Sequence, residues 1–358
     1  MEPVPRRRQG LSELKLMPST IRDVAKRAGV GLGTVSRVLN GSPQVSEDTR
    51  QLVLKAIEEL DFHPSGIARR LSLGKTFTIA VVAPFFTRPA IVERLRGVEA
   101  TISGSGYDMV VYNIESPERM QHAFRDLARH MRVDGVLVIS LLLAGEDLVR
   151  FREVGIPVVL IDVPVHGMEQ ASSIGTGDVQ GSQLAVEHLI HLGHEQIGFL
   201  GSGNTDHLSS SHNQQRFAGY KKAMKKAGLT INQEYVRDTE SGRHAARRET
   251  AELLRLPTPP TAIFAVSDTQ ALGVLEAARE AELHVPDQLS VVGYNDEAFA
   301  EYMSLTTVRA QAFESGQRGV VTLFDQLAHP GQAAVRETLE PELIVRTTTG
   351  PMKSISAN

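Results

Sequence analysis

From residue 78 onward, short apolar runs alternate with longer amphipathic stretches. Strands are predicted where valine, isoleucine and other apolar residues cluster, at 78–84, 107–112, 134–140, 156–162, 196–201, 261–266 and 289–294. Helices are predicted where apolar residues recur at helical spacing, at 91–103, 117–130, 179–191, 215–227, 243–256 and 269–282. Repeated strand–helix–strand units predict parallel sheets covered by helices on both faces. Two such sets predict an α/β region of two Rossmann-like lobes, with a ligand cleft at the carboxyl ends of the strands.

Before residue 76 the pattern predicts three short helices instead. Thr20 is a good N-cap for a first helix, and Gly29 supplies its C-cap and a tight turn. A second helix is expected from about 31 to 39, and Ser46 opens a third that runs through about residue 60. This order is typical of a helix-turn-helix module, whose second helix enters the major groove.

The faces of these helices can also be predicted. The inner face of the third helix is expected to hold Leu52, Val53, Ala56, Ile57 and Leu60. The outer face of the second helix carries a leucine, short polar groups and one arginine: Leu32, Gly33, Thr34, Ser36 and Arg37. Such a face suits the edges of DNA bases.

Charge separates the same two parts. The net charge of −4 conceals a head, residues 1–75, with 13 Lys and Arg against 8 Asp and Glu, a balance of +5. The rest of the chain holds 25 basic and 34 acidic residues, a balance of −9. A basic head on an acidic body indicates a polyanion-binding module joined to another domain.

Composition limits the remaining possibilities. Cysteine is absent, which excludes disulfides, a thiolate nucleophile and cysteine-ligated metals. No run approaches the roughly 18 apolar residues of a membrane helix, so no membrane partner is expected. No apolar stretch follows the basic cluster at 6–8, as a signal peptide would require. We therefore expect a cytoplasmic protein, on the nucleoid when it is bound to DNA.

Two stretches in the head resemble one known family. "IRDVAKRAGVGLGTVSRVLNG" at 21–41 and "VSEDTRQLVLKAIEELDFHPSGIARRLSLGKT" at 45–76 resemble the DNA-binding head and hinge of the LacI/GalR family of bacterial transcription regulators. One departure is Gly31, where the family usually has a serine that caps the recognition helix. The resemblance implies that DNA is contacted by Thr20, Leu32, Gly33, Thr34, Ser36, Arg37, Asn40, Ala68, Arg69 and Leu71. It also implies a hinge that folds on the operator, with Leu71 wedged into the minor groove.

Four further stretches resemble the effector-binding core of the same family, which is related in fold to periplasmic sugar-binding proteins. They are "GSQLAVEHLIHLGHEQIGFLG", "QRFAGYKKAMKKAGL", "PTAIFAVSDTQALGVLEAA" and "PDQLSVVGYNDEAFAEYMSLTTVR". The resemblance implies that the ligand is reached by Asp162, Arg216, Ser267 and Asn295. A carboxylate accepts hydrogen bonds from sugar hydroxyls, and a guanidinium donates them. Asn295 stands where the family more usually has Asp, and an amide both donates and accepts.

Other residues near the expected cleft have two interpretations each. Phe85 and Phe86 are candidates to stack on a sugar ring, although aromatic residues at a strand end are often core. Arg88 in the same loop is a candidate partner for a phosphorylated or acidic effector. Asp268 is expected to cap the helix that follows it, and Asp296 either caps a turn or touches the ligand.

Neither catalysis nor metal binding is indicated. In "HLIHLGH", His188 and His191 share a helix face, but Gly193 ends the helix and turns His194 elsewhere, so no metal site is expected. The "GKT" at 74–76 is not a phosphate loop, because that motif needs glycine where Arg69 stands. No nucleophile elbow or zinc-protease motif occurs in the sequence, so we expect no enzyme activity and no cofactor.

Three functions fit a two-lobe binding domain: a ligand-controlled transcription factor, a solute-binding protein and a sugar-processing enzyme. The basic head favours the first. We expect an all-α helix-turn-helix head and an α/β effector domain. The protein is expected to be a homodimeric repressor that binds double-stranded, near-palindromic operator DNA, with a sugar or sugar derivative as effector. Relief of repression is the expected effect of this ligand, and corepression is the alternative. The predicted divisions are a disordered extension at 1–17, the head at 18–63, a hinge at 64–76, the effector and dimerisation domain at 77–347 and a flexible tail at 348–358. This tail lacks leucine heptads, so no tetramerising coiled coil is expected.

Overall fold

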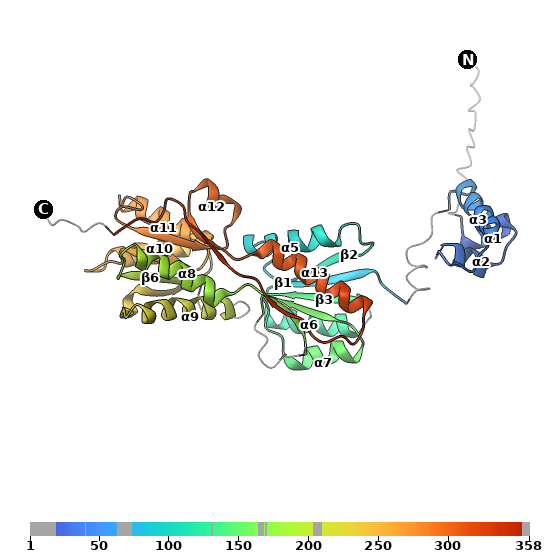
Figure 1. Ribbon diagram of the computed structural model, residues 1–358, viewed down its shortest axis with the longest axis horizontal. Helices are drawn as coiled ribbons and strands as arrows, with labels where there is room; N and C mark the ends of the chain where they lie inside the picture. Colours follow the sequence, from blue (N-terminus) through green and yellow to red (C-terminus); the bar gives the residue numbers. More distant parts are fainter. Residues whose placement is uncertain are drawn as a thin grey trace, which may run out of the picture. The chain divides into compact units, whose positions relative to one another are not determined.

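The computed structural model describes residues 19–39, 41–62, 74–129, 132–163, 168, 170–202 and 210–352. The chain divides into two compact units, Met1–Lys75 and Thr76–Asn358. Figure 1 shows a small helical unit at the blue end of the chain and a larger unit that contains both sheets. Among the described residues, no helix has the length and apolar character needed to cross a membrane.

The first unit is a bundle of three helices: α1 (Ile21–Ala28), α2 (Leu32–Leu39) and α3 (Glu47–Glu59). Thr20 and Asp23 form a capping box at the start of α1, and Gly29 ends that helix in the left-handed conformation at φ 68°. The core contains one fully buried valine from each helix, Val24, Val35 and Val53. The predicted helices and the cap are confirmed.

One detail of this prediction is wrong. Leu52 was assigned to the inner face of α3, but it is 56% exposed. Val53 and Ala56 lie three residues apart and therefore share the buried face, whereas the side chain before Val53 is rotated by about 100° from it. The inward register of α3 therefore begins at Val53.

The N-terminal lobe of the second unit is built on a six-stranded parallel sheet in the order β11-β5-β4-β3-β1-β2. Its strands are β1 (Thr78–Pro84), β2 (Asp108–Ile114), β3 (Gly135–Ile139), β4 (Val158–Ile161), β5 (Ser172–Gly175) and β11 (Arg336–Thr338). Alternate residues of β1 enter separate cores on the two faces of the sheet. One core is covered by α5 (Pro89–Ile102) and α13 (Ala312–Ala328), the other by α6 (Pro117–Arg129) and α7 (Gly145–Glu153).

The C-terminal lobe repeats this plan with the sheet order β12-β10-β9-β8-β6-β7, in which only the pairing of β12 with β10 is antiparallel. Its strands are β6 (Ile197–Ser202), β7 (Val236–Thr239), β8 (Ala262–Ala265), β9 (Ser290–Tyr294), β10 (Thr306–Arg309) and β12 (Glu342–Ile344). Its helices are α8 (Asp178–His191), α9 (Ser210–Lys226), α10 (Arg243–Leu254), α11 (Asp268–Glu280) and the short α12 (Ala298–Tyr302), with a 3₁₀ turn at Gln233–Tyr235.

Three segments connect the lobes. The chain leaves the first sheet after β5, returns from β10 into α13, and crosses again between β11 and β12. The helix α13 packs along α5, so a helix late in the sequence completes the first lobe (Figure 1). A change in the angle between the lobes must therefore be taken up by these three connections.

All seven predicted strands are present, and each predicted helix of the two lobes overlaps an observed one. The helices α7, α12 and α13 and the strands β5, β7, β10, β11 and β12 were not predicted. The predicted flexible tail at 348–358 is wrong for its first part. Thr348 is buried and donates to the carbonyl of Val291, and the amide of Met352 donates to the carbonyl of Leu192. The predicted extension at 1–17 and residues 353–358 lie outside the described residues.

Candidate effector cavity and nucleic-acid interface

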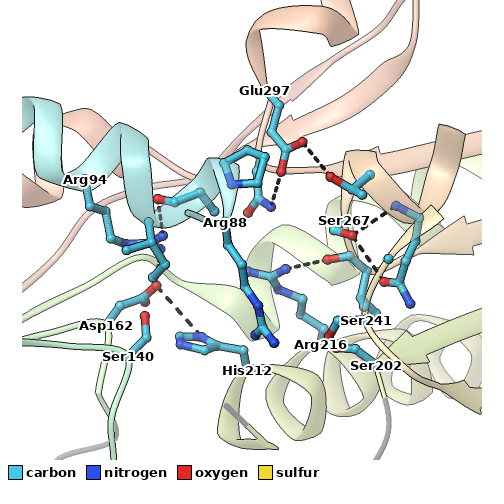
Figure 2. A pocket seen from close by; sticks show the side chains of 18 residues that line it. Arg88, Arg94, Ser140, Asp162, Ser202, His212, Arg216, Ser241, Ser267 and Glu297 are labelled. Atoms are coloured by element: carbon cyan, nitrogen blue, oxygen red, sulfur yellow. Dashed lines mark hydrogen bonds and ion pairs between the residues drawn. The ribbon is translucent and has the colours of Figure 1, made fainter. Parts of the chain in front are cut away.

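A cavity of about 210 Å³ lies between the two lobes, where β3, β4, β8 and β9 end. This volume is below the roughly 300–1,000 Å³ that is typical of pockets for drug-sized ligands, so the cavity suits a ligand smaller than those. Most of its lining residues are polar or charged, a few are apolar, and none of the described ones is Phe, Tyr or Trp: Arg88, Pro89, Ala90, Ile91, Arg94, Ser140, Asp162, Ser202, His212, Arg216, Ser241, Gly242, Val266, Ser267, Thr269, Gln270, Asn295 and Glu297 (Figure 2).

Asp162 is the acidic group of the N-terminal lobe. It follows β4 in the left-handed backbone conformation, with φ 59°, and is buried. Its Oδ2 accepts a charge-assisted hydrogen bond from the guanidinium of Arg94, and its Oδ1 accepts one from Thr176 Oγ1 at 2.5 Å. Because both oxygens have protein donors, the carboxylate is held in one orientation at the edge of the cavity.

Arg216 is the corresponding cation of the C-terminal lobe. It lies on α9, and its Nε donates to Asp178 Oδ1 at 2.8 Å while one terminal nitrogen donates to the carbonyl of Val266 at 2.5 Å. The guanidinium carbon lies 3.8 Å from the ring centroid of Tyr294, close enough for a cation–π contact. Burial alone would raise the pKa of Asp178, but the charges of Arg216 and His212 outweigh it and lower that pKa below its usual range.

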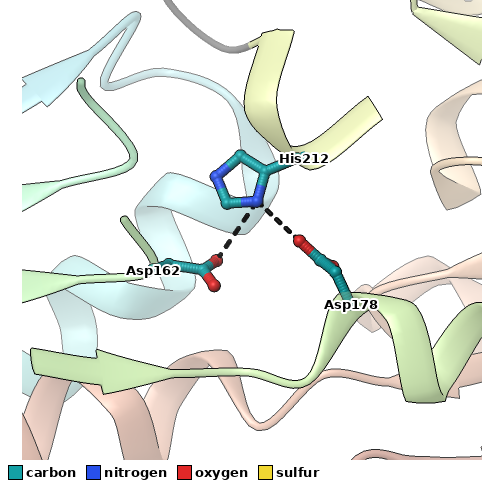
Figure 3. A group of neighbouring side chains, drawn as sticks. All are labelled: Asp162, Asp178 and His212. Carbon is teal, nitrogen blue, oxygen red and sulfur yellow. Dashed lines mark hydrogen bonds and ion pairs between the residues drawn. The ribbon is translucent and has the colours of Figure 1, made fainter. Parts of the chain in front are cut away.

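His212 joins these two groups. Its Nδ1 lies 2.7 Å from Asp178 Oδ2 and 3.8 Å from Asp162 Oδ2, so the imidazole stands between carboxylates of both lobes (Figure 3). Its Nε2 is buried and has no hydrogen-bond partner among the described residues. Because His212 lines the cavity, this unpartnered nitrogen can form a hydrogen bond with a polar ligand.

The same three residues have the composition of a metal site, since their ligand atoms lie within 4.8 Å of one another. However, Arg94 already donates to Asp162, and Arg216 to Asp178. A divalent cation would have to approach these two guanidinium groups and compete for their carboxylates. The donor set therefore fits an ion-pair network better than a metal centre, and the absence of a metal stays a prediction.

A third group of side chains follows β9 and α11. Asn295 has a left-handed backbone, at φ 108°, and its Nδ2 donates to Glu297 Oε1 at 3.5 Å. Glu297 Oε2 accepts from Thr269 Oγ1 at 3.0 Å. Burial raises the pKa of Glu297 to about 7, against the smaller opposite effects of these hydrogen bonds and of Arg216. Ser267 is the N-cap of α11, and its Oγ accepts from the amide of Gln270 at 3.2 Å.

The structure brings four predicted ligand residues, Asp162, Arg216, Ser267 and Asn295, to this one cavity, and it also places Arg88 there. Two predicted residues are elsewhere. Phe85 packs against the core of the N-terminal lobe, and Phe86 is 42% exposed; neither lines the cavity. The stacking prediction is therefore corrected.

The cap prediction for Asp268 is also wrong. Ser267 caps α11, while Asp268 is buried behind it and accepts from Thr307 Oγ1 at 2.5 Å and from the amide of Glu297 at 2.6 Å. Asp296 pairs with Arg309 and Arg346 and does not line the cavity. Both aspartates position the loop after β9.

Several lining residues were missed from the sequence, among them Arg94, Ser140, His212, Thr269, Gln270 and Glu297. One signal was available for His212, because it lies four residues before Arg216 and therefore on the same face of one helix. Nothing in the sequence indicated Arg94, whose partner Asp162 is 68 residues away.

In the first unit, α2 presents the predicted DNA-reading face. Leu32, Gly33 and Arg37 are exposed, with Leu32 at 46%, while Thr34 and Ser36 are half-buried. The amides of Thr34 and Val35 donate to the carbonyl of Gly31, so this glycine starts the helix without a side-chain cap. Thr20 is exposed, with its hydroxyl bound to Asp23 Oδ2 at 2.7 Å. The predicted contacts Asn40, Ala68, Arg69 and Leu71 lie outside the described residues.

Comparison with known proteins identifies the class of molecule that this fold defines. Residues 20–65 match the family model for bacterial regulatory proteins of the lacI family, and residues 186–349 match that for a periplasmic binding protein-like domain. The chain is 33% identical over 333 residues to the HTH-type transcriptional repressor PurR of Actinobacillus pleuropneumoniae serotype 3 (strain JL03), covering 92% of this chain and 97% of that relative.

Solved structures agree. The lac repressor dimer bound to operator and the anti-inducer ONPF has a TM-score of 0.81 and 28% identity, covering 93% of this chain and all of that one. The transcriptional regulator CelR in complex with cellobiose has a TM-score of 0.68 and 30% identity, covering 92% of this chain and 99% of that one. The chain belongs to the LacI family. It is a DNA-binding transcriptional repressor of that family, with an effector-binding domain.

Proposed function

We propose that the inter-lobe cavity binds a sugar or sugar derivative, and that this ligand changes the affinity of the head for operator DNA. One observation carries the proposal: Asp162 from one lobe and Arg216 from the other line the same cavity. They are connected through Asp178, which pairs with Arg216, and through His212, which lies between Asp178 and Asp162. A polyhydroxylated ring offers hydroxyls that donate to the carboxylate and accept from the guanidinium. Relatives have been solved with cellobiose and, in a regulator from Enterococcus faecium, with ribose.

The ligand acts because it contacts both lobes at once. A molecule that bridges them favours one inter-lobe angle over others, and the three connections transmit that preference through the effector domain. Couplings of this kind are typically about 1–3 kcal/mol, which corresponds to a roughly 5–150-fold change in operator affinity. Relief of repression by the ligand is the expected sign.

On DNA, two copies of the chain form a symmetric dimer on a near-palindromic operator. The relative solved as a dimer on operator supports this assembly. The exposed face of α2 reads base edges in the major groove, with Arg37 as its one arginine. Residues 64–76 are proposed to order between the two heads, with Leu71 inserted at the central base step.

A thermal-shift screen tests the effector proposal. The full chain is heated with each member of a panel of mono- and disaccharides that includes D-ribose and cellobiose, and binding raises the melting temperature by mass action. The variant Asn295→Ala is expected to lose the ligand-induced rise in melting temperature. The side chain of Asn113 does not line the cavity, so the control Asn113→Ala is expected to keep that rise. If no carbohydrate raises the melting temperature of the wild-type chain, the sugar assignment is wrong.

A further inference from the structure

We infer that Glu297 supplies the effector-binding carboxyl group on the C-terminal wall of the cavity. It thereby selects neutral polyols that donate a hydrogen bond to that wall, over sugar acids. This inference rests on the proposed function, and it names the ligand chemistry and a specificity residue of the same cavity.

The geometry places the Glu297 carboxyl group in the cavity wall. Its two oxygens accept from Asn295 Nδ2 at 3.5 Å and from Thr269 Oγ1 at 3.0 Å, and the residue lines the cavity (Figure 2). Its backbone amide donates to the buried Asp268 at 2.6 Å. Contacts from α11 on both the backbone and the side chain therefore hold the carboxyl group in position.

Asn295 makes a different contribution to this wall. Its amide carries no charge, and its Nδ2 is directed to Glu297. Its Oδ1 is buried and has no hydrogen-bond partner among the described residues. The carboxyl group of this part of the wall is therefore that of Glu297. Asn295 donates to it and keeps an oxygen that can accept from a ligand hydroxyl.

The charges around Glu297 come from four elements. Arg216 on α9 and Arg88 before α5 line the same cavity, and Asp268 begins α11. Asp296, on the loop itself, is paired with Arg309 at 2.7 Å and with Arg346 at 2.8 Å. Burial raises the pKa of Asp268 to about 8, and its two oxygens accept from Thr307 Oγ1 and from the amide of Glu297.

The protonation of Glu297 then sets the pH dependence of binding. Its pKa is raised to about 7 by burial, so in the free protein the charged and neutral forms coexist near neutrality. A ligand hydroxyl that donates to this group favours the carboxylate, and bound polyol therefore lowers the pKa. Between pH 6 and pH 8, affinity for such a ligand should rise by up to about tenfold. A sugar acid would instead place a second anion beside Glu297.

Calorimetric titration of the full chain tests this. The probes are the carbohydrate that gives the largest thermal shift and its corresponding sugar acid, each at pH 6 and pH 8. We expect the neutral sugar to bind Glu297→Gln at least tenfold more weakly than wild type at pH 8, with little pH dependence left. The double variant Asn295→Asp/Glu297→Gln, which moves the carboxyl group to position 295, should recover binding. Glu301→Gln, on the exposed face of α12, is the matched control and should behave as wild type.

The outcomes separate this inference from the proposed function. If the wild-type chain binds a sugar and Glu297→Gln binds it with the same affinity and pH profile, the role of Glu297 is overturned while the cavity assignment stands. Tighter binding of the sugar acid than of the neutral sugar also overturns it. If no carbohydrate binds the wild-type chain, the proposed function fails and this inference fails with it. Melting temperatures of the free variants show that each is folded.

Discussion

The head and the effector cavity use arginine in opposite ways. Arg37 on α2 is exposed and has no side-chain partner among the described residues. Arg216 and Arg94 are buried, and each is paired with an aspartate and a backbone carbonyl. An exposed arginine contributes to binding and little to folding. A buried one is part of the structure that positions the cavity, so its loss should affect both.

The largest effect is expected for Arg216→Ala. Removing the guanidinium leaves Asp178 buried without its main partner, and breaking a buried pair typically costs about 3–5 kcal/mol. Urea unfolding should show that loss, and sugar binding should disappear with it. Arg255→Ala removes an exposed pair with Glu252 and should change the stability by less than about 1 kcal/mol. If the two variants lost the same free energy of unfolding, the distinction between buried and exposed arginines would be wrong.

Arg37→Ala should show the reverse pattern. Operator affinity is expected to fall by about 1–3 kcal/mol, because a base contact is lost, while the urea midpoint stays at the wild-type value. Fluorescence anisotropy on operator and on random duplex DNA measures the effect. A similar loss on both DNAs would show that Arg37 contacts phosphate rather than bases.

Glu297→Gln tests the cavity without removing a cation. A carboxyl group whose pKa is raised in the folded state stabilises the fold fully only below its unfolded pKa, and that contribution is lost as pH rises to the folded pKa of about 7. Relative to wild type, Glu297→Gln should therefore gain about 2–3 kcal/mol between pH 5 and pH 8. Denaturation at several pH values measures this difference, and a pH-independent difference would contradict the raised pKa.

The smallest effect is expected in the head. Thr20→Ala removes the capping box of α1 and should cost about 1 kcal/mol of stability, while Thr20→Ser keeps the hydroxyl and should cost much less. Circular dichroism during thermal unfolding of the full chain reports the change in the head. A larger loss for the serine variant than for the alanine variant would contradict the cap.

The two regions also differ in what the sequence predicts. The three helices of the head and most of the longer elements of the two lobes followed from local periodicity. The caps Thr20 and Gly29 are next to the helix that they begin and end. The cavity depends on contacts over long separations, such as Arg94 with Asp162 and His212 with Asp178. Local patterns carry no information on such pairs, and only the resemblance to a family indicated Asp162 and Arg216. The stacking role predicted for Phe85 was wrong, because its side chain packs against the core of the N-terminal lobe, which was the alternative interpretation of an aromatic residue at a strand end.

Operator affinity measured with and without a bound sugar is the most direct test of the central claim. Operator DNA is selected by the full chain from a random duplex pool, and its dissociation constant is measured by anisotropy with and without the carbohydrate that gives the largest thermal shift. The account predicts a roughly 5–150-fold change, lost in Asn295→Ala, whose operator affinity without sugar stays normal. A sugar that binds the cavity and leaves operator affinity unchanged would contradict it.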